Sequence, residues 1–139
     1  MRTILLIMIG FSLLQADFIR IGDVVKDTVS KLEWQDNNNT KTITKNWSDA
    51  IDYCENLNFD GHSDWRLPNI NELKSIIDRS KSNPAIVQGF KNIISSSYWS
   101  STTREDYKNY AWIVNFGDGS VYNDNKDYNY YVRCVRDGQ

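Results

Sequence analysis

A proline placed directly before a helix-start signal is the strongest constraint on the fold of this chain. Pro68 lacks a backbone N–H and restricts Leu67 to an extended conformation, so the segment before the proline is not helical. Asn69 is followed three residues later by Glu72, which is the capping-box pattern of a helix N-terminus. The sequence therefore predicts an extended segment that turns into a helix at Ile70.

The residues before this proline alternate in character. Trp65 and Leu67 are expected to face the core, because successive side chains of an extended chain point to opposite sides. Asp64 and Arg66 then share the other side and could pair with each other. We favour a structural role for this segment, with direct ligand contact as the alternative. The predicted structural signature comprises Asp64, Trp65, Arg66, Leu67, Pro68, Trp99 and Trp112.

The first residues have the features of an export signal. Arg2 precedes a continuous apolar run over residues 4–14, which has the length of a signal-peptide core and is too short for a membrane span. We expect residues 1–16 to be a signal peptide that is cleaved after Ala16, and the alternative is an uncleaved N-terminal anchor. Residues 17–139 would then form one domain in an extracytoplasmic compartment, periplasmic or secreted, with no stable membrane anchor.

Hydrophobic periodicity divides the chain into an early helical part and a late strand-rich part. The sequence predicts an α+β fold, in which two helices pack on a twisted antiparallel sheet with long loops. Residues 117–119 (Gly-Asp-Gly) predict a hairpin turn within the late part. The expected helices cover residues 47–57 and 70–78, and the expected strands comprise two within 18–35 and others over 98–102, 110–116, 120–122 and 128–136.

The two cysteines predict a disulfide. Cys54 lies on the apolar stripe of the first predicted helix and Cys134 lies in the last predicted strand. In an exported chain, two cysteines favour a structural bond over free thiols. The alternative is a catalytic thiol, which requires a nearby base, and His62 is the only histidine in the sequence.

The best candidate for a binding surface is a segment rich in tyrosine and asparagine, residues 103–131. Tyrosine supplies rigid aromatic area and asparagine supplies adaptable hydrogen bonding, a combination that is typical of recognition loops. The alternative is that half of the tyrosines alternate into the sheet. The predicted ligand-binding residues are Tyr107, Tyr110, Tyr122, Asn123, Asp124, Tyr128 and Tyr130.

Charge narrows the class of partner. The whole chain has a formal net charge of −2, which argues against a nucleic-acid partner that is held through phosphates. Residues 103–131 contain three basic and five acidic residues, a net charge of −2. A neutral glycan or a protein ligand therefore fits better than a heparin-like polyanion.

Other chemistry is expected to be absent or secondary. No cofactor is predicted, although calcium could be held by the carboxylates of Asp118, Asp124 or Asp127, which we otherwise interpret as turn formers. Glu105 and Asp106 lie in a predicted loop, and nothing in the sequence supports a glycosidase pair. Three tryptophans are interpreted as core aromatics rather than sugar platforms, namely Trp34, Trp99 and Trp112.

Six blocks of sequence carry a family resemblance. The chain resembles the Lcl C-terminal domain, a bacterial family that was first described as a domain of unknown function and later named after a collagen-like adhesin. The blocks occur in order and cover nearly all of residues 17–139. They are residues 32–36 (LEWQD), 46–54 (NWSDAIDYC), 61–68 (GHSDWRLP), 98–102 (YWSST), 112–119 (WIVNFGDG) and 131–136 (YVRCVR).

The resemblance implies a C-type-lectin-like fold, in which a cysteine of the first helix pairs with one in the final strand. It also implies an extracytoplasmic binding module, since the namesake's domain binds sulfated polysaccharide. This chain departs from that pattern, because it has no collagen-like repeat and is acidic. It also lacks the Glu-Pro-Asn or Gln-Pro-Asp loop and the Trp-Asn-Asp strand of calcium-dependent lectins.

These observations predict a non-enzymatic module that binds a glycan or a protein through its C-terminal loops and acts in adhesion or carbohydrate binding. The first alternative is a structural or interaction domain of a bacterial envelope assembly. A second alternative is an enzyme of the sulfatase-activating type, which would require a free reactive thiol. The oligomeric state is not predicted.

Overall fold

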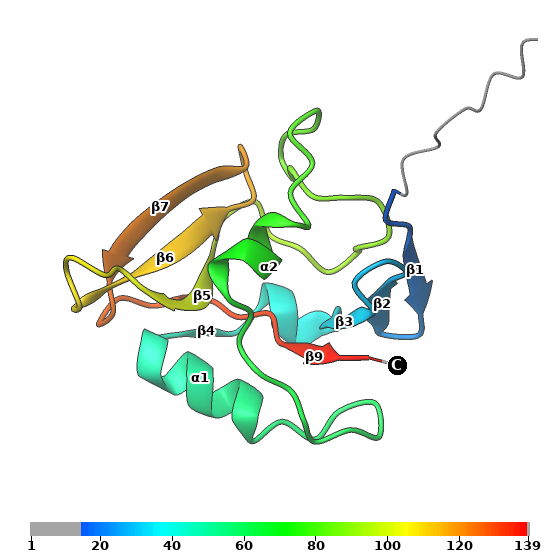
Figure 1. Ribbon diagram of the computed structural model, residues 1–139, viewed down its shortest axis with the longest axis horizontal. Coiled ribbons are helices and arrows are strands. Elements are labelled where there is room, and N and C mark those ends of the chain that lie inside the picture. The colour runs from blue at the N-terminus through cyan, green and yellow to red at the C-terminus, as the bar shows by residue number, and fades with distance from the viewer. Residues whose placement is uncertain (1–14, 139) are drawn as a thin grey trace, which may run out of the picture.

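The computed structural model describes residues 15–138 of the chain. They form two β-sheets, of four and five strands, and two short α-helices (Figure 1). The predicted α+β class is confirmed, although the strands divide between two sheets. Apart from residues 15 and 16, the predicted signal peptide lies outside the described residues, and the C-type-lectin-like assignment stays a prediction.

The four-stranded sheet joins the two ends of the domain. Residues 18–35 form three strands rather than the two predicted, because Gly22 adopts a φ of 61° and closes a tight turn between the first two. The third strand pairs with the last strand of the chain, so that Trp34 lies opposite Val135. The order is β1 (Phe18–Ile21), β2 (Val24–Asp27), β3 (Leu32–Gln35) and β9 (Val135–Asp137).

The five-stranded sheet holds most of the predicted binding segment. Its neighbours pair antiparallel except β5 and β8, which run parallel. The predicted hairpin at residues 117–119 is confirmed and connects β6 to β7. The strand predicted over 128–136 instead splits between the two sheets. The order is β4 (Thr44–Lys45), β8 (Tyr130–Tyr131), β5 (Ser97–Thr103), β6 (Tyr110–Asn115) and β7 (Ser120–Asn125).

Both helices start at the predicted residues, 47 and 70, but both end early. Helix α1 (Trp47–Glu55) begins where the Asn46 side chain accepts a hydrogen bond of 2.9 Å from the Asp49 N–H. A 3₁₀ turn, η1 (Asn38–Lys41), precedes it. Helix α2 (Ile70–Lys74) carries the predicted capping box. It ends four residues before the predicted end because residues 76–78 leave the helix to pair with residues 85–87.

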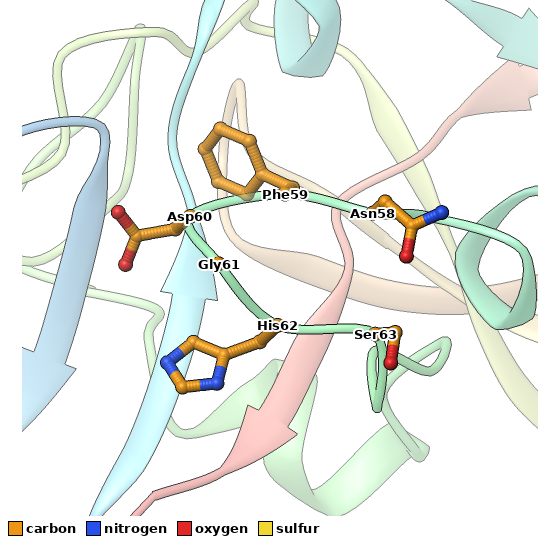
Figure 2. A pocket seen from close by; sticks show the side chains of 6 residues that line it. All are labelled: Asn58, Phe59, Asp60, Gly61, His62 and Ser63. Carbon is orange, nitrogen blue, oxygen red and sulfur yellow. The ribbon is translucent and has the colours of Figure 1, made fainter.

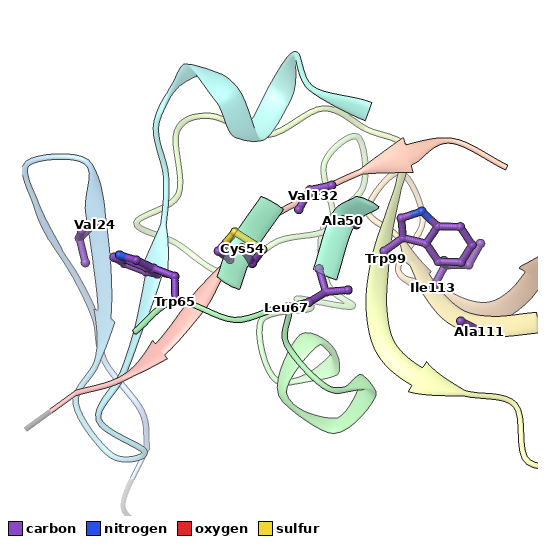
Figure 3. Packing of buried hydrophobic residues seen from close by; sticks show 10 residues of the cluster. Val24, Ala50, Cys54, Trp65, Leu67, Trp99, Ala111, Ile113 and Val132 are labelled. Atoms are coloured by element: carbon purple, nitrogen blue, oxygen red, sulfur yellow. A yellow bond between two sulfur atoms is a disulfide. The ribbon is translucent and has the colours of Figure 1, made fainter. Parts of the chain in front are cut away.

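The five-stranded sheet separates two clusters of buried side chains. On one face, Trp99 and Ile113 pack with residues of α1 and with Leu67 (Figure 3). On the opposite face, Tyr98 and Val114 pack with α2 and the irregular segment after it. The sheet is therefore covered on both faces at the end near residues 97–99.

The predicted disulfide is confirmed. Cys54 on α1 and Cys134 before β9 are bonded, with Cα atoms 5.5 Å apart, and both side chains are buried in the first cluster. Because these two are the only cysteines of the chain, no free thiol is present. Closing a loop of this length stabilises the folded state by about 4 kcal/mol in the chain-entropy picture.

A buried ionic cluster, which the sequence did not predict, links the two sheets. Arg133 donates to Asp36 and to the backbone carbonyls of Gln35 and Asn92, and Arg20 pairs with Asp36 from β1. Neither Arg133 nor Asp36 exposes any side-chain surface. The segment that contains Asp36 is therefore anchored in the core.

Candidate functional site

Four of the seven predicted ligand-binding residues lie on the β6–β7 ribbon, and they fall on its two opposite faces. Directly opposed residues of antiparallel strands point to the same side, and neighbours along a strand alternate. Trp112 lies opposite Asn123 on one face, whereas Ile113 lies opposite Tyr122 and Ala111 lies opposite Asp124 on the other. The seven residues consequently do not form a single surface.

The members on the face of the first cluster are engaged inside the protein. The Tyr122 hydroxyl is hydrogen-bonded to the Ser97 hydroxyl, and the Tyr130 hydroxyl donates to the Asp124 carboxylate. The Tyr130 ring also packs edge-on against Trp99, with ring centroids 5.0 Å apart. Burial, together with the hydrogen bond to Asp124, raises the pKa of Tyr130. These three residues have structural contacts that support the sheet.

The other face of the ribbon carries a groove, which we call the Trp112 groove. It has a volume of about 550 Å³ and lies where β5 ends and the following loop turns back toward β6. Trp112 supplies its aromatic wall and is half-buried, so the prediction of a core position is wrong for this tryptophan, while Trp34 and Trp99 are fully buried as predicted. The lining residues are Thr102, Thr103, Arg104, Glu105, Asp106 and Trp112.

The indole N–H of Trp112 is available for a ligand. Three other tryptophans donate to backbone carbonyls at 2.9–3.0 Å, and the indole N–H of Trp34 is buried without a partner. The Trp112 N–H has no hydrogen-bond partner within residues 15–138, and its side chain borders the groove. A tryptophan that combines an accessible ring with an unused donor is typical of a recognition site.

The charged residues of the groove are held in place by one another. The Arg104 guanidinium donates to both carboxylate oxygens of Asp106, at 2.8 and 3.1 Å, and also to the Asn123 side chain at 3.1 Å. The hydrogen bond from Arg104 lowers the pKa of Asp106, and Asp106 raises the pKa of Arg104. Arg104 thereby connects the loop of the groove to β7 and fixes Asn123 beside Trp112.

Two of the predicted tyrosines, Tyr107 and Tyr110, lie near Arg104, and a third, Tyr128, lies apart from it. Tyr107, 52% exposed, packs edge-on against Tyr110 with centroids 4.7 Å apart, in the loop that follows Arg104. Tyr110 shares the Trp112 face of β6. Tyr128, 56% exposed, lies in the turn between β7 and β8. The groove, Asn123, Tyr107 and Tyr110 therefore form the candidate site.

The carboxylates considered for calcium do not converge. Asp118 lies in the β6–β7 turn and accepts from Ser120, whereas Asp124 lies near the other end of β7 and accepts from Tyr130. Within residues 15–138, no group of three or more histidine, cysteine, aspartate or glutamate side chains is arranged to hold a metal ion.

The segment before Pro68 is a structural joint, but its ion pairs differ from the prediction. Arg66 does not pair with Asp64. It forms a bidentate pair with Glu72 at 2.6 and 2.7 Å and a further bond to Asp137. Asp64 instead pairs with Arg136 of β9 at 2.7 Å. The pairing differs because α2 places Glu72 beside Arg66, while the backbone bridge between Arg66 and Val135 brings β9 alongside the segment.

Two further hollows carry fewer recognition features. The loop over residues 58–63 lines an open hollow of about 300 Å³ (Figure 2). An adjacent hollow of about 270 Å³ is lined by Lys26, Glu33, His62 and Arg136, of which Glu33 and Arg136 are paired. Neither hollow contains a tryptophan.

The chain matches a family model, although no curated protein matches it. The family model described as the Lcl C-terminal domain matches residues 23–136, which is most of the chain and includes both cysteines, the joint and the Trp112 groove. Within residues 15–138, neither helix has the length and apolar character of a membrane span.

The matched residues 23–136 make up most of the sequence, so the chain belongs to the Lcl C-terminal domain family.

Proposed function

We propose that this protein is an extracytoplasmic, non-enzymatic binding domain that recognises a glycan through the Trp112 groove. The observation that carries the proposal is the half-buried Trp112, with an unpaired indole N–H, in the wall of a groove that also contains hydroxyl and carboxylate groups. The internal disulfide and the apolar run at residues 4–14 support an extracytoplasmic location.

The composition of the groove favours an uncharged sugar. An indole ring offers a flat apolar surface for the C–H face of a sugar, and the neighbouring hydroxyl and amide groups offer hydrogen bonds to its hydroxyls. Arg104, Glu105 and Asp106 give the lining one positive and two negative charges, and Asp106 already neutralises Arg104. A sulfated ligand would therefore meet repulsion at Glu105, and the only cation among the lining residues, Arg104, is already paired.

A glycan array tests the proposal directly. The mature protein should retain neutral oligosaccharides, and adding a chelator should leave the signal unchanged, because the groove lining does not require a cation. Trp112→Ala should abolish retention, and Trp112→Phe should weaken it by removing the indole N–H. Tyr128→Ala is the matched control, since Tyr128 is exposed and lies outside the groove.

Retention that is unaffected in a folded Trp112→Ala protein would refute the groove as the site. Retention of sulfated glycans alone would refute the proposed ligand class. Binding of a protein ligand to the same groove is the alternative within the same function, and competition by that ligand for the oligosaccharide would reveal it.

A second candidate function is a subunit contact in an envelope assembly. Its support is edge strand β1, where Ile19 is 49% exposed and Ile21 is 67% exposed. Exposed apolar side chains on an unpaired sheet edge are typical of strand-mediated association. Sedimentation of the mature protein, alone and with envelope extract, tests this function, and Ile19→Lys with Ile21→Lys should abolish any association that uses the edge.

A further inference from the structure

Three Asp-Gly pairs occur in the chain, at residues 60–61, 118–119 and 137–138. The backbone nitrogen of a glycine can attack the side-chain carboxyl of a preceding aspartate, because glycine has no side chain to obstruct the approach. The attack needs a glycine N–H that is not held by a hydrogen bond and a carboxyl group that is free to turn toward it. The structure separates the three pairs on both requirements.

Two of the pairs are restrained at both reacting groups. The Gly119 N–H donates to the Asn115 carbonyl at 2.8 Å, and the Asp118 carboxylate accepts from the Ser120 N–H and hydroxyl. At the C-terminal end, the Gly138 N–H donates to the Lys31 carbonyl at 3.0 Å, and the Asp137 carboxylate accepts from Arg66. Reaction at either pair would first require these hydrogen bonds to break.

The pair at residues 60–61 is free at both groups. Asp60 and Gly61 form the tip of a two-residue turn with φ values of 54° and 75°, which is closed by the reciprocal backbone hydrogen bonds of Phe59 and His62. Those bonds bypass the Gly61 N–H. Within residues 15–138, neither that N–H nor the Asp60 carboxylate has a hydrogen-bond partner, and both residues are exposed.

The surroundings leave room for the carboxyl group to turn. Figure 2 shows the Asp60 side chain pointing away from the loop and from the Phe59 ring. A methyl group built on Gly61 would meet no atom within 4 Å. The same construction at Gly119 meets Ile77 at 2.9 Å, and at Gly138 it meets the Lys31 carbonyl at 2.1 Å. The tip of the 58–63 loop is thus the one uncrowded Asp-Gly pair in the described chain.

We propose that Asp60 is a site of spontaneous isomerisation to isoaspartate. The Gly61 nitrogen forms a bond to the carboxyl carbon of protonated Asp60, and the carboxyl hydroxyl leaves with the amide hydrogen as water. The product is a five-membered cyclic imide. Water then adds to one of its two carbonyls and breaks one of the two C–N bonds. One outcome restores aspartate, and the other carries the main chain through the side-chain methylene.

Isomerisation lengthens the main chain of the turn by one atom. This change should disturb the structural joint, the segment before Pro68. The Phe59 carbonyl, at the base of the turn, accepts a hydrogen bond of 3.0 Å from the Trp65 indole. A change in the Phe59–His62 pairing therefore moves the carbonyl to which the Trp65 indole N–H donates. Indole fluorescence of aged protein should change in proportion to the isoaspartate content of the loop.

The test compares three sites within one molecule. Folded, disulfide-intact wild-type protein is aged for several weeks in mildly acidic buffer, and isoaspartate is located by peptide mapping with a protease that cuts before aspartate and not before isoaspartate. Isoaspartate should accumulate at residue 60 about tenfold faster than at 118 or 137, because protected amides react only through local opening. In reduced protein in concentrated urea, the three rates should become similar.

Equal rates at the three sites of the folded protein, faster reaction at 118 or 137, or no isoaspartate at residue 60 would each overturn the proposal. Asp60→Glu serves as a control, because glutamate would have to close a larger ring, and its residue 60 should stay unmodified. The comparison does not depend on that variant, since all three sites are measured in the wild-type chain.

Discussion

Arg133 donates a hydrogen bond of 2.8 Å from Nη1 to Oδ1 of Asp36, and both side chains are completely buried although they lie 97 residues apart in sequence. The Phe90 and Tyr98 rings face the guanidinium, with centroids 4.9 and 5.6 Å from its central carbon. This pair joins the end of the four-stranded sheet to the segment before β9. Its removal should therefore affect the whole domain.

Removing one partner of this pair should strongly destabilise the protein. Asp36→Asn leaves the Arg133 charge buried without its counter-ion, and we expect the free energy of unfolding to fall by about 3–5 kcal/mol. Urea denaturation followed by tryptophan fluorescence measures the change. Arg104→Ala, which breaks the exposed pair with Asp106, is the control and should leave the urea midpoint nearly unchanged. A small effect of Asp36→Asn would show that the buried pair is not an anchor.

Stability should fall in acid because of the same residue. Burial opposes ionisation of Asp36, but the charge of Arg133 and the hydrogen bonds from the Lys91 N–H, Arg133 and Arg20 outweigh it and lower its pKa. A carboxyl group with a lowered native pKa stabilises the fold fully above its ordinary value of 3.8 and loses that contribution as pH falls through the native pKa. Urea midpoints measured from neutral pH downward should show the loss, and Asp36→Asn should flatten the curve.

Two tyrosines should ionise late in an alkaline titration. Burial raises the pKa of Tyr98, and burial with the hydrogen bond to Asp124 raises that of Tyr130. In the unfolded state these tyrosines keep their ordinary pKa of about 10, so they lose their protons at lower pH there than in the folded state. Stability should therefore fall as pH rises above about 10. Phenolate absorbance of the native protein should show a late step among the eight tyrosines. Tyr130→Phe should reduce that step, and an unchanged step would contradict the assignment.

Loss of the disulfide should lower the stability of the protein. The native protein, in which both cysteines are bonded, should contain no reactive thiol. The double variant Cys54→Ala with Cys134→Ala should lose about 4 kcal/mol of unfolding free energy, since the bond closes a loop of 80 residues. Differential scanning calorimetry of the wild type with and without reductant provides the comparison. Native protein should not react with a thiol-specific reagent until it is reduced, and labelling before reduction would refute the disulfide.

Two glycines should respond differently to alanine. Gly61 and Gly119 both have positive φ values, 75° and 79°, so each Gly→Ala change should cost about 1–2 kcal/mol through backbone strain. At Gly119 the added methyl group would also lie 2.9 Å from Ile77, whereas at Gly61 it would meet open space. Gly119→Ala should therefore lower the urea midpoint more than Gly61→Ala. Equal midpoints would show that Ile77 moves aside freely.

Local signals in the sequence predicted the elements that depend on nearby residues. The helix starts at residues 47 and 70, the turn at 117–119 and the cysteine pairing all agree with the structure. These features involve short sequence separations or, for the cysteines, the only available pairing. Their physical causes are therefore contained in the sequence pattern itself.

Features that depend on what covers a surface were not predictable in the same way. Trp99 and Trp112 both lie in aromatic strand segments, yet α1 covers the first and the second borders a groove. Tyr122 and Asn123 are neighbours in sequence and point to opposite faces of the ribbon. The pairing of Arg133 with Asp36 and that of Asp64 with Arg136 likewise depended on which distant segments lie side by side.

The position of β9 has a consequence for synthesis. The last strand of the four-stranded sheet and the second cysteine both lie within residues 134–137, and their partners, β3 and Cys54, were made about 80 to 100 residues earlier. A nascent chain that has not reached residue 133 lacks the strand that completes the four-stranded sheet, the Arg133 guanidinium that pairs with Asp36 and the thiol that would oxidise with Cys54. None of these three connections can therefore form until residues 133–137 have been synthesised.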